Sequence, residues 1–223
     1  MNIYSSTLFL ILFAFSTSLI AQPTAGHLGE SDPRAQKVLD RLSEKYKKFN
    51  TVRTDFILTI ESVEDDINEK QEGKLFLKGD KFRLEFEDQL IISDNKTIWT
   101  YLKDVEEVNI NVYEEDENSI SPSELFTIYE RDFLYLLAEE WREGNRNYQK
   151  VSLTPIDKSL SYFKIDMIIE KNSNTFVSAK IFDKSGLRFT YEMENFEGNP
   201  NLSNALFNFD PKNHPNVMVN DLR

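Results

Sequence analysis

The chain has 223 residues, no cysteine and a formal net charge of -12, which comes from 38 acidic and 26 basic residues. Without cysteine it has no disulfide, no thiol nucleophile and no thiol for lipid attachment. The acidic excess argues against binding to nucleic acid or to an anionic membrane, because both attract basic surfaces. It fits solubility or, more specifically, a basic partner surface.

The first residues, MNIYSSTLFLILFAFSTSLIAQ, contain an apolar run from Leu8 to Phe15 that is too short to cross a bilayer as a helix. Such a run is typical of a signal peptide, and we place the cut after Ala21. A membrane anchor or a buried strand is the alternative. We therefore expect a signal peptide over residues 1–21 and one exported domain over residues 22–223, because no repeat or linker divides the rest.

A helix is predicted to begin at Asp32-Pro33, because proline suits the first helical turn. The apolar residues that follow recur at helical spacing: Ala35, Val38, Leu39, Leu42, Tyr46 and Phe49. The opposite side carries charged residues, so this helix should bury one stripe.

From residue 55 the apolar period changes to two, which is typical of antiparallel strands with one buried face. Phe56 and Leu58 share a face in one segment, and Phe82, Leu84 and Phe86 alternate with charged residues in another. The predicted strands cover residues 55–63, 72–79, 81–87, 89–93, 97–102, 107–113, 147–155, 161–171, 175–183 and 187–196. After residue 195 we expect irregular chain with short edge segments.

The middle of the chain has a different pattern. Ser121-Pro122-Ser123-Glu124 resembles a capping box, so two short helices are predicted, over residues 125–129 and 132–141. In the second, Phe133, Leu137 and Trp141 are spaced by four residues. Together these elements predict a single α+β domain, with about ten strands in a curved antiparallel sheet and the helices on its concave side.

No constellation for catalysis is evident. His27 and His214 lie in polar, weakly patterned surroundings, away from any serine motif of a hydrolase. Gly73 and Gly79 are wrongly spaced for a phosphate loop, and the acidic stretch from Glu114 to Glu117 lacks the spacing of a calcium loop. We expect no catalytic residue, no metal site and no cofactor, which favours binding over enzymatic activity.

The stretch from Glu72 to Ile110 resembles the periplasmic lipoprotein carrier (LolA) family, above all in SDNKTIWTY from Ser93 to Tyr101. The ending ALFNFDPKNHPNVMVNDLR is similar to the close of that family. One departure is that the family's Arg-Pro after the basic strand end corresponds to Lys78-Gly79-Asp80 here, which leaves Lys78 as the partner-binding candidate.

The resemblance implies an unclosed β half-barrel of about ten to eleven strands with a helical lid. It also implies the function of the LolA family, whose members carry triacylated lipoproteins from an inner-membrane ABC exporter across the periplasm to an outer-membrane acceptor. The resemblance implies that Phe82, Leu84 and Phe86 pave a lipid-binding cavity. The other expected lipid-binding residues are Phe56, Leu58, Trp99 and Tyr101 on the sheet and Leu42, Phe49, Phe133 and Leu137 under the lid.

Two alternatives stay open at this point. Any of these apolar side chains can also be ordinary packed core. A lipid- or lipoprotein-sensing regulatory domain shares the same expected architecture. In either case we expect a monomer that binds no nucleic acid.

Overall fold

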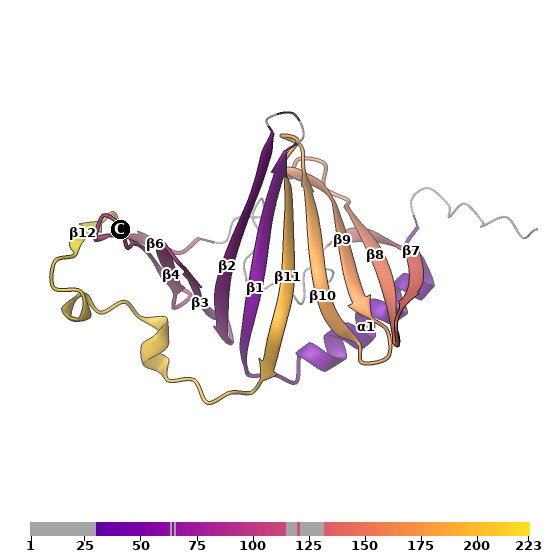
Figure 1. The fold of residues 1–223 in the computed structure, drawn as a ribbon, viewed down its shortest axis with the longest axis horizontal. Coiled ribbons are helices and arrows are strands. Elements are labelled where there is room, and N and C mark those ends of the chain that lie inside the picture. The colour runs from indigo at the N-terminus through magenta and orange to yellow at the C-terminus, as the bar shows by residue number, and fades with distance from the viewer. Residues whose placement is uncertain (1–29, 63, 65, 115–119, 121–131) are drawn as a thin grey trace, which may run out of the picture.

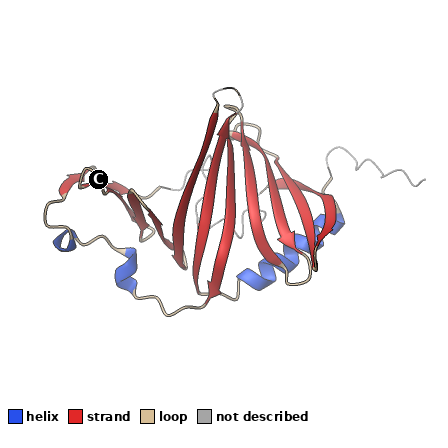
Figure 2. Cartoon of the chain, viewed as in Figure 1, coloured by secondary structure: helices blue, strands red, loops and turns tan. Residues whose placement is uncertain are grey.

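The computed structural model describes residues 30–62, 64, 66–114, 120 and 132–223. Within these residues one α-helix precedes a single sheet of twelve strands, and two short 3-10 helices lie near the C-terminus (Figures 1 and 2). The elements are α1 (Pro33–Tyr46), β1 (Thr51–Ser62), β2 (Ile67–Lys78), β3 (Lys81–Phe86), β4 (Gln89–Ser93), β5 (Thr97–Leu102), β6 (Glu107–Val112), β7 (Phe133–Glu143), β8 (Arg146–Pro155), β9 (Tyr162–Glu170), β10 (Thr175–Asp183), β11 (Arg188–Gly198), η2 (Asn204–Phe207), η3 (Pro211–Asn213) and β12 (Met218–Asp221).

The strands follow the order β12-β6-β5-β4-β3-β2-β1-β11-β10-β9-β8-β7. Neighbouring strands are antiparallel except β12, which runs parallel to β6. The two outermost strands, β12 and β7, do not pair with each other, so the sheet is unclosed. All ten predicted strand segments correspond to strands and the expected antiparallel sheet is confirmed, but the sheet has twelve strands where about ten to eleven were expected.

One predicted helix is wrong. Residues 132–141 were expected to be helical, but β7 spans Phe133–Glu143 and pairs with β8 along its length. A register shift between Leu137 and Glu139 inserts one extra residue into the strand. The bulge moves Trp141 to the outer side, where it stacks on Tyr148 with ring centroids 5.4 Å apart. The other predicted helix, over residues 125–129, lies outside the described residues.

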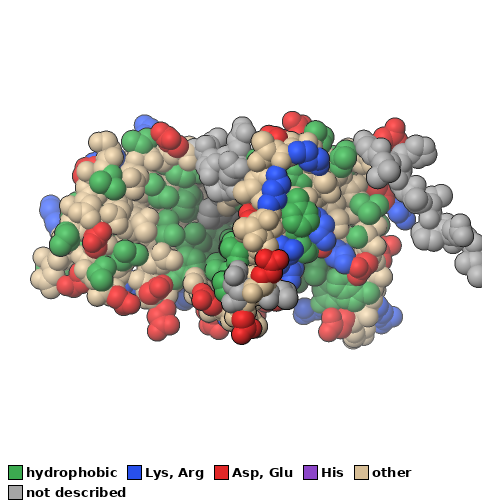
Figure 3. Space-filling model, turned by 90° about the horizontal axis from the view of Figure 1, so that it is seen from above, with side chains coloured by type: hydrophobic (Ala, Val, Ile, Leu, Met, Phe, Trp, Pro, Cys, Tyr) green, Lys and Arg blue, Asp and Glu red, His purple; other side chains and the backbone are tan. Residues whose placement is uncertain are grey.

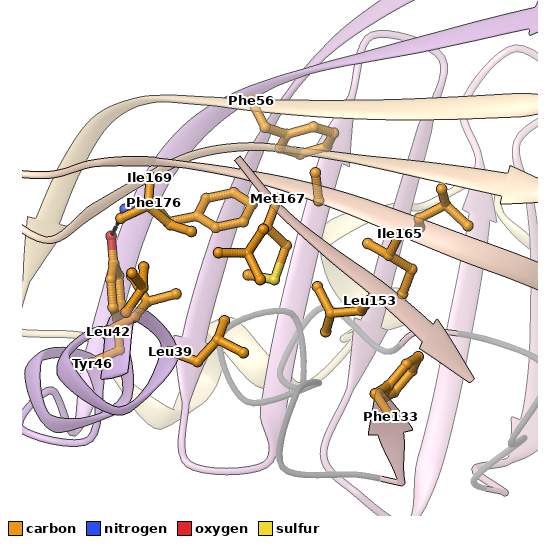
Figure 4. Packing of buried hydrophobic residues seen from close by; sticks show 14 of the residues in the cluster. Leu39, Leu42, Tyr46, Phe56, Phe133, Leu153, Ile165, Met167, Ile169 and Phe176 are labelled. Carbon is orange, nitrogen blue, oxygen red and sulfur yellow. Dashed lines mark hydrogen bonds between the residues drawn. The ribbon is translucent and has the colours of Figure 1, made fainter. Parts of the chain in front are cut away.

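Helix α1 begins as its sequence predicts and packs across one half of the sheet. The Asp32 carboxylate caps the helix by accepting the backbone N–H of Arg34 at 2.8 Å. The helix packs against buried residues of β8, β9 and β10, among them Met167 and Phe176 (Figure 4). The helix residues buried in this core are Ala35, Val38, Leu39, Leu42 and Tyr46. We call the sheet face that α1 covers the inner face.

The register separates the sheet residues into two faces, because directly paired residues point to the same side. Leu84 pairs with Leu75 and Ile91, which places these three on the inner face. Apolar residues at the alternate positions of β4, β5 and β6 point the other way and form a second core with Phe209 of the C-terminal segment. This outer core consists of Leu90, Ile92, Trp99, Tyr101, Val108, Ile110 and Phe209.

Residues 199–217, which we call the C-terminal segment, connect β11 to β12 across the outer face (Figure 1). Two aromatic residues of this segment, Phe207 and Phe209, are buried. His214 stacks on Phe209 with centroids 4.7 Å apart and lies 4.6 Å from the ring of Tyr101. The segment is therefore docked on the sheet by aromatic contacts before β12 joins β6.

Burial of Tyr46 on α1 should make the unfolding free energy depend on pH in the alkaline range. Burial raises the pKa of Tyr46 to about 12, and its hydroxyl accepts the backbone N–H of Phe176 at 3.1 Å. An unfolded tyrosine ionises near pH 10, so this contribution is complete below pH 10 and is lost between pH 10 and about 12. Over that window we expect a decrease of about 3 kcal/mol in unfolding free energy from this residue.

Urea unfolding of the wild type and of Tyr46→Phe at several alkaline pH values tests this. The variant should be about 1–2 kcal/mol less stable at pH 8, because the Phe176 N–H loses its acceptor. As the pH rises from 10 to 12 the difference should fall to zero and then reverse, because only the wild type loses the contribution of about 3 kcal/mol. A difference that stays constant over this range would contradict the assignment.

Candidate functional site

An apolar pocket of about 280 Å³ lies on the inner face, beside the half of the sheet that α1 covers. Its wall comes from five strands, β1 to β4 and β11, and from one residue of the β6–β7 connection. The lining residues are Phe56, Leu58, Gln71, Leu75, Leu84, Phe86, Gln89, Ile91, Ile120, Tyr191 and Met193. None of these described residues carries a charge at neutral pH, so the pocket suits an apolar ligand.

Cross-strand pairing explains why these side chains meet. Phe56 is opposite Met193, and Leu58 is opposite Tyr191, in the β1–β11 register. On its other side, β1 places Phe56 opposite Gly73 of β2. The alternation of each strand therefore delivers its apolar residues to one continuous inner surface.

Gly73 creates the space for an aromatic pair at the edge of the pocket. A Cβ atom at this position would lie 2.6 Å from the Phe56 ring and 2.9 Å from the main-chain oxygen of Glu85. The Phe56 ring instead lies over the glycine and meets Phe86 edge-on, with centroids 5.3 Å apart. The sheet is therefore thin at this point, because position 73 contributes no side chain.

The polar groups of the pocket lie at its margin and are uncharged. Gln71 on β2 and Gln89 on β4 contribute amides, and Tyr191 contributes a phenol. Burial raises the pKa of Tyr191, which keeps its hydroxyl neutral. Seen from above, hydrophobic side chains gather beside the hollow in the middle of the molecule, and several Lys and Arg side chains lie on its other side (Figure 3).

The structure brings four of the expected lipid-binding residues together in this pocket: Phe56, Leu58, Leu84 and Phe86. Phe82 is on the same face, but it is buried and its ring meets Tyr113 edge-on at 5.9 Å. It supports the pocket from the neighbouring position on β3 and is not part of its lining.

The four residues expected under the lid occupy different places. Leu42 is on α1 and is fully buried in the main core. Phe49 follows the helix and packs against Phe196 and Gly198 at the end of β11. Phe133 and Leu137 belong to the sheet, on the inner face of β7, so their placement on a lid helix is wrong.

Trp99 and Tyr101 are on the outer face, so the expectation that they extend the wall made by Phe82, Leu84 and Phe86 is wrong. Trp99 pairs with Ile92, and Tyr101 pairs with Leu90, whereas Leu84 is aligned with Ile91. Both aromatics are 8% exposed because the C-terminal segment covers them. They are packed core between the sheet and this segment.

Lys78, the expected partner-binding residue, has an intramolecular contact. Its ammonium group donates a hydrogen bond of 2.9 Å to the main-chain oxygen of Leu202. Arg83 makes a similar contact to the oxygen of Leu206 at 3.2 Å. These two cations hold the first part of the C-terminal segment against β2 and β3.

Sequence reasoning missed seven residues of the lining: Leu75, Ile91, Ile120, Tyr191, Met193, Gln71 and Gln89. Tyr191 and Met193 follow the same alternation as the residues that were selected, so the signal was present. For Gln71 on β2 and Gln89 on β4 no signal existed, because the sequence does not indicate which polar residues of a strand border a cavity.

A second and larger cavity of about 1060 Å³ lies on the outer face, between β1 to β5 and the C-terminal segment. We call it the outer cleft. Within the described residues no cluster of histidine and acidic side chains could hold a metal ion. No helix in the described part of the chain is both long and apolar enough to cross a membrane.

Comparisons with known proteins agree with this architecture. The family model described as outer membrane lipoprotein carrier protein LolA matches residues 47–210, a range that contains the whole inner pocket. A search among curated proteins gave no match.

Several solved structures share the fold. An uncharacterized conserved protein from Thermus thermophilus has a TM-score of 0.51 and 16% identity, over 84% of this chain and 99% of that chain. For LprF from Mycobacterium bovis the values are 0.48 and 15%, over 78% and 97%. A LolA superfamily protein from Nitrosomonas europaea gives 0.43 and 13%, over 79% and 98%. At these identities the similarity concerns the fold alone.

A charge placed in the inner pocket should abolish its affinity for apolar ligands. Leu84→Glu adds a carboxylate to an uncharged lining, and we expect binding of an apolar fluorescent dye to weaken at least about tenfold. Leu84→Trp, which fills the pocket without a charge, should also weaken binding.

Lys81→Glu is the matched control, since Lys81 is on the same strand and points to the outer face. It should bind the dye like the wild type. Circular dichroism establishes that all variants are folded. Equal dye affinity in folded Leu84→Glu and Lys81→Glu would show that the dye binds elsewhere.

Removing the Lys78 contact should loosen the C-terminal segment. We expect Lys78→Met to lower the unfolding free energy by about 1 kcal/mol, because the Leu202 oxygen loses a charged donor. Hydrogen exchange should rise in residues 202–209, and Lys70→Met, an exposed change on the same strand, should leave exchange there unaltered. Unchanged exchange in Lys78→Met would contradict the anchoring role.

Proposed function

Because the chain belongs to the LolA family, whose members are lipoprotein carriers, we propose that it carries acylated lipoproteins through the periplasm as a monomer. The acyl chains occupy the inner apolar pocket. The observation that carries this proposal is the uncharged lining of that pocket, which four residues named by the family resemblance help to form. Its role is to bind cargo and pass it on without chemical change.

The physical need for such a pocket follows from the hydrophobic effect. Each CH₂ group removed from water contributes about 0.8 kcal/mol, so a chain of many CH₂ groups cannot cross an aqueous compartment unprotected. A dry, concave surface replaces the membrane as its environment. The half-exposed residues Leu84, Phe86 and Met193 are the part of the wall that such a chain would cover.

The closed pocket is too small for a triacylated cargo. Its volume of about 280 Å³ is at the lower limit of ordinary ligand pockets, which begin near 300 Å³. Loading therefore requires side chains, or α1 itself, to move away from the inner face. In the empty protein the same side chains cover one another, which avoids both a large dry void and a wide exposed apolar patch.

The direction of lipoprotein transport is set by the partner proteins at the two membranes. The chain has no nucleotide-binding motif, so energy for loading comes from an inner-membrane ABC exporter. Unloading requires an outer-membrane acceptor that binds the acyl chains more tightly. Residues 1–21 serve as the signal peptide that places the protein in the periplasm, and the acidic surface favours basic docking surfaces on its partners.

A release assay tests the function directly. Inner-membrane vesicles that contain the exporter and an acylated lipoprotein are supplied with ATP and the purified mature protein. We expect a soluble one-to-one complex of lipoprotein and carrier. Leu84→Glu should release little lipoprotein, whereas Lys81→Glu should behave like the wild type.

Two results would count against the proposal. If lipoprotein stays in the vesicles although folded protein, exporter and ATP are present, the carrier function is wrong. If the complex forms but never delivers cargo to an outer-membrane acceptor, a sensing role explains the binding better.

A further inference from the structure

The outer cleft has a lining unlike that of the inner pocket. Its floor is the outer face of β1 to β5, and its roof is the C-terminal segment from Ser203 to His214. With a volume of about 1060 Å³ it is the larger of the two cavities. One part of its surface is charged, and another part, made by Leu90, Ile92, Tyr101 and Phe209, is apolar.

The two cavities lie on either side of one thin wall. Phe56 and Phe86 line both of them, at the point where Gly73 has no side chain. The neighbouring residues divide between the two sides: Gln71 and Gln89 border the inner pocket, while Glu72 and Glu87 border the outer cleft. Phe56 and Phe86 therefore mark the place where the two cavities come nearest to each other.

Part of the edge of β2 is left open because β3 is shorter than β2. The β2–β3 pairing covers only Gly73 to Lys78, and β3 ends at Phe86. Among the described residues, the rest of β2, from Ile67 to Glu72, pairs with β1 alone. A polypeptide that leaves the inner pocket over the β3–β4 turn would meet this unpaired strand edge, which can form main-chain hydrogen bonds with an extended peptide.

The outer cleft has an excess of negative charge. Its acidic lining residues are Asp55, Glu72, Glu85, Glu87, Glu194 and Asp210, and its basic ones are Lys74, Arg83 and Lys103. Two of the cations are already engaged: Arg83 pairs with Glu85 at 2.6 Å, and Lys103 donates to the main-chain oxygen of Glu87 at 2.9 Å. In the described part of the chain no ion pair joins Glu72 or Glu194 to a cation.

We propose that the inner pocket and the outer cleft form one binding site for a lipid-modified polypeptide. The inference rests on the proposed carrier function and names the part of the cargo that the inner pocket does not hold. The acyl chain lies against Phe56 and Phe86, the polypeptide leaves over the β3–β4 turn, and its first residues lie in the outer cleft. Glu72 and Glu194 contact basic side chains of that segment.

The cargo chemistry explains why the occupant is a polypeptide. An acyl chain held inside an uncharged pocket remains covalently attached to a polar chain, which must leave the pocket without burying its main-chain groups unpaired. The unpaired edge of β2 supplies partners at the exit. Beyond it, carboxylates favour lysine and arginine, and the apolar part of the floor accommodates a large side chain.

Binding of synthetic palmitoylated peptides tests the site. One peptide carries two lysines directly after the acylated residue, and a second carries two glutamates in the same positions. We expect the wild type to bind the lysine peptide about tenfold more tightly at low salt, as two exposed charge pairs allow. Glu72→Gln combined with Glu194→Gln should remove most of that preference and leave binding of an apolar dye unchanged.

The matched control combines Glu44→Gln with Glu143→Gln, which removes the same charge from α1 and β7, away from the cleft. It should keep the tenfold preference. A benzophenone placed beside the lysines should cross-link to residues of the outer cleft.

The outcomes separate the two proposals. If neither the dye nor any acylated peptide binds, the proposed function fails and this inference fails with it. If both bind but the peptides do not differ, or the cleft variant behaves like its control, the carrier function stands and the shared site is wrong. Cross-links confined to other surfaces lead to the same conclusion.

Discussion

The cross-strand register of β2, β3, β4 and β5 is the constraint on which the rest of the structure depends. Leu84 is aligned with Leu75 and Ile91, and one position away Glu85 is aligned with Lys74 and Leu90. A shift of a single residue would exchange the inner and outer faces of these strands. The uncharged pocket and the charged cleft would then lose their separate linings, so both candidate sites follow from this one pairing pattern.

Periodicity predicted the strands well because alternation is a local property. Each segment such as KFRLEFE shows its apolar and polar sides without reference to other segments. What periodicity cannot provide is which apolar sides meet. Trp99 and Tyr101 alternate as clearly as Phe82 and Leu84, yet they face the opposite way, and the contact that buries them comes from Phe209 more than a hundred residues later.

The β7 segment shows how tertiary pairing overrides local preference. Leucine, alanine and glutamate in FLYLLAEEWRE all favour helices, and Phe133, Leu137 and Trp141 match a helical stripe. The same segment also fits a strand with one bulge. Phe133 and Leu137 lie on the inner face, and the bulge between Leu137 and Glu139 turns Trp141 to the outer face. The free edge of β8 satisfies the main chain of β7, an interaction that no inspection of β7 alone could reveal.

In the proposed shared site, the two cavities would contribute to recognition through different physical interactions. In the proposed carrier, burial of an acyl chain against Phe56, Leu84 and Met193 would be non-directional and would depend on chain length, so the inner pocket alone would not distinguish one lipid-modified protein from another. Charge contacts in the outer cleft depend on the identity of side chains and are weakened by salt. Gly73 links the two, because the missing side chain leaves only the Phe56–Phe86 pair between them. A carrier of this construction would obtain its affinity from the lipid and its selectivity from the polypeptide, with a single aromatic contact separating the two terms.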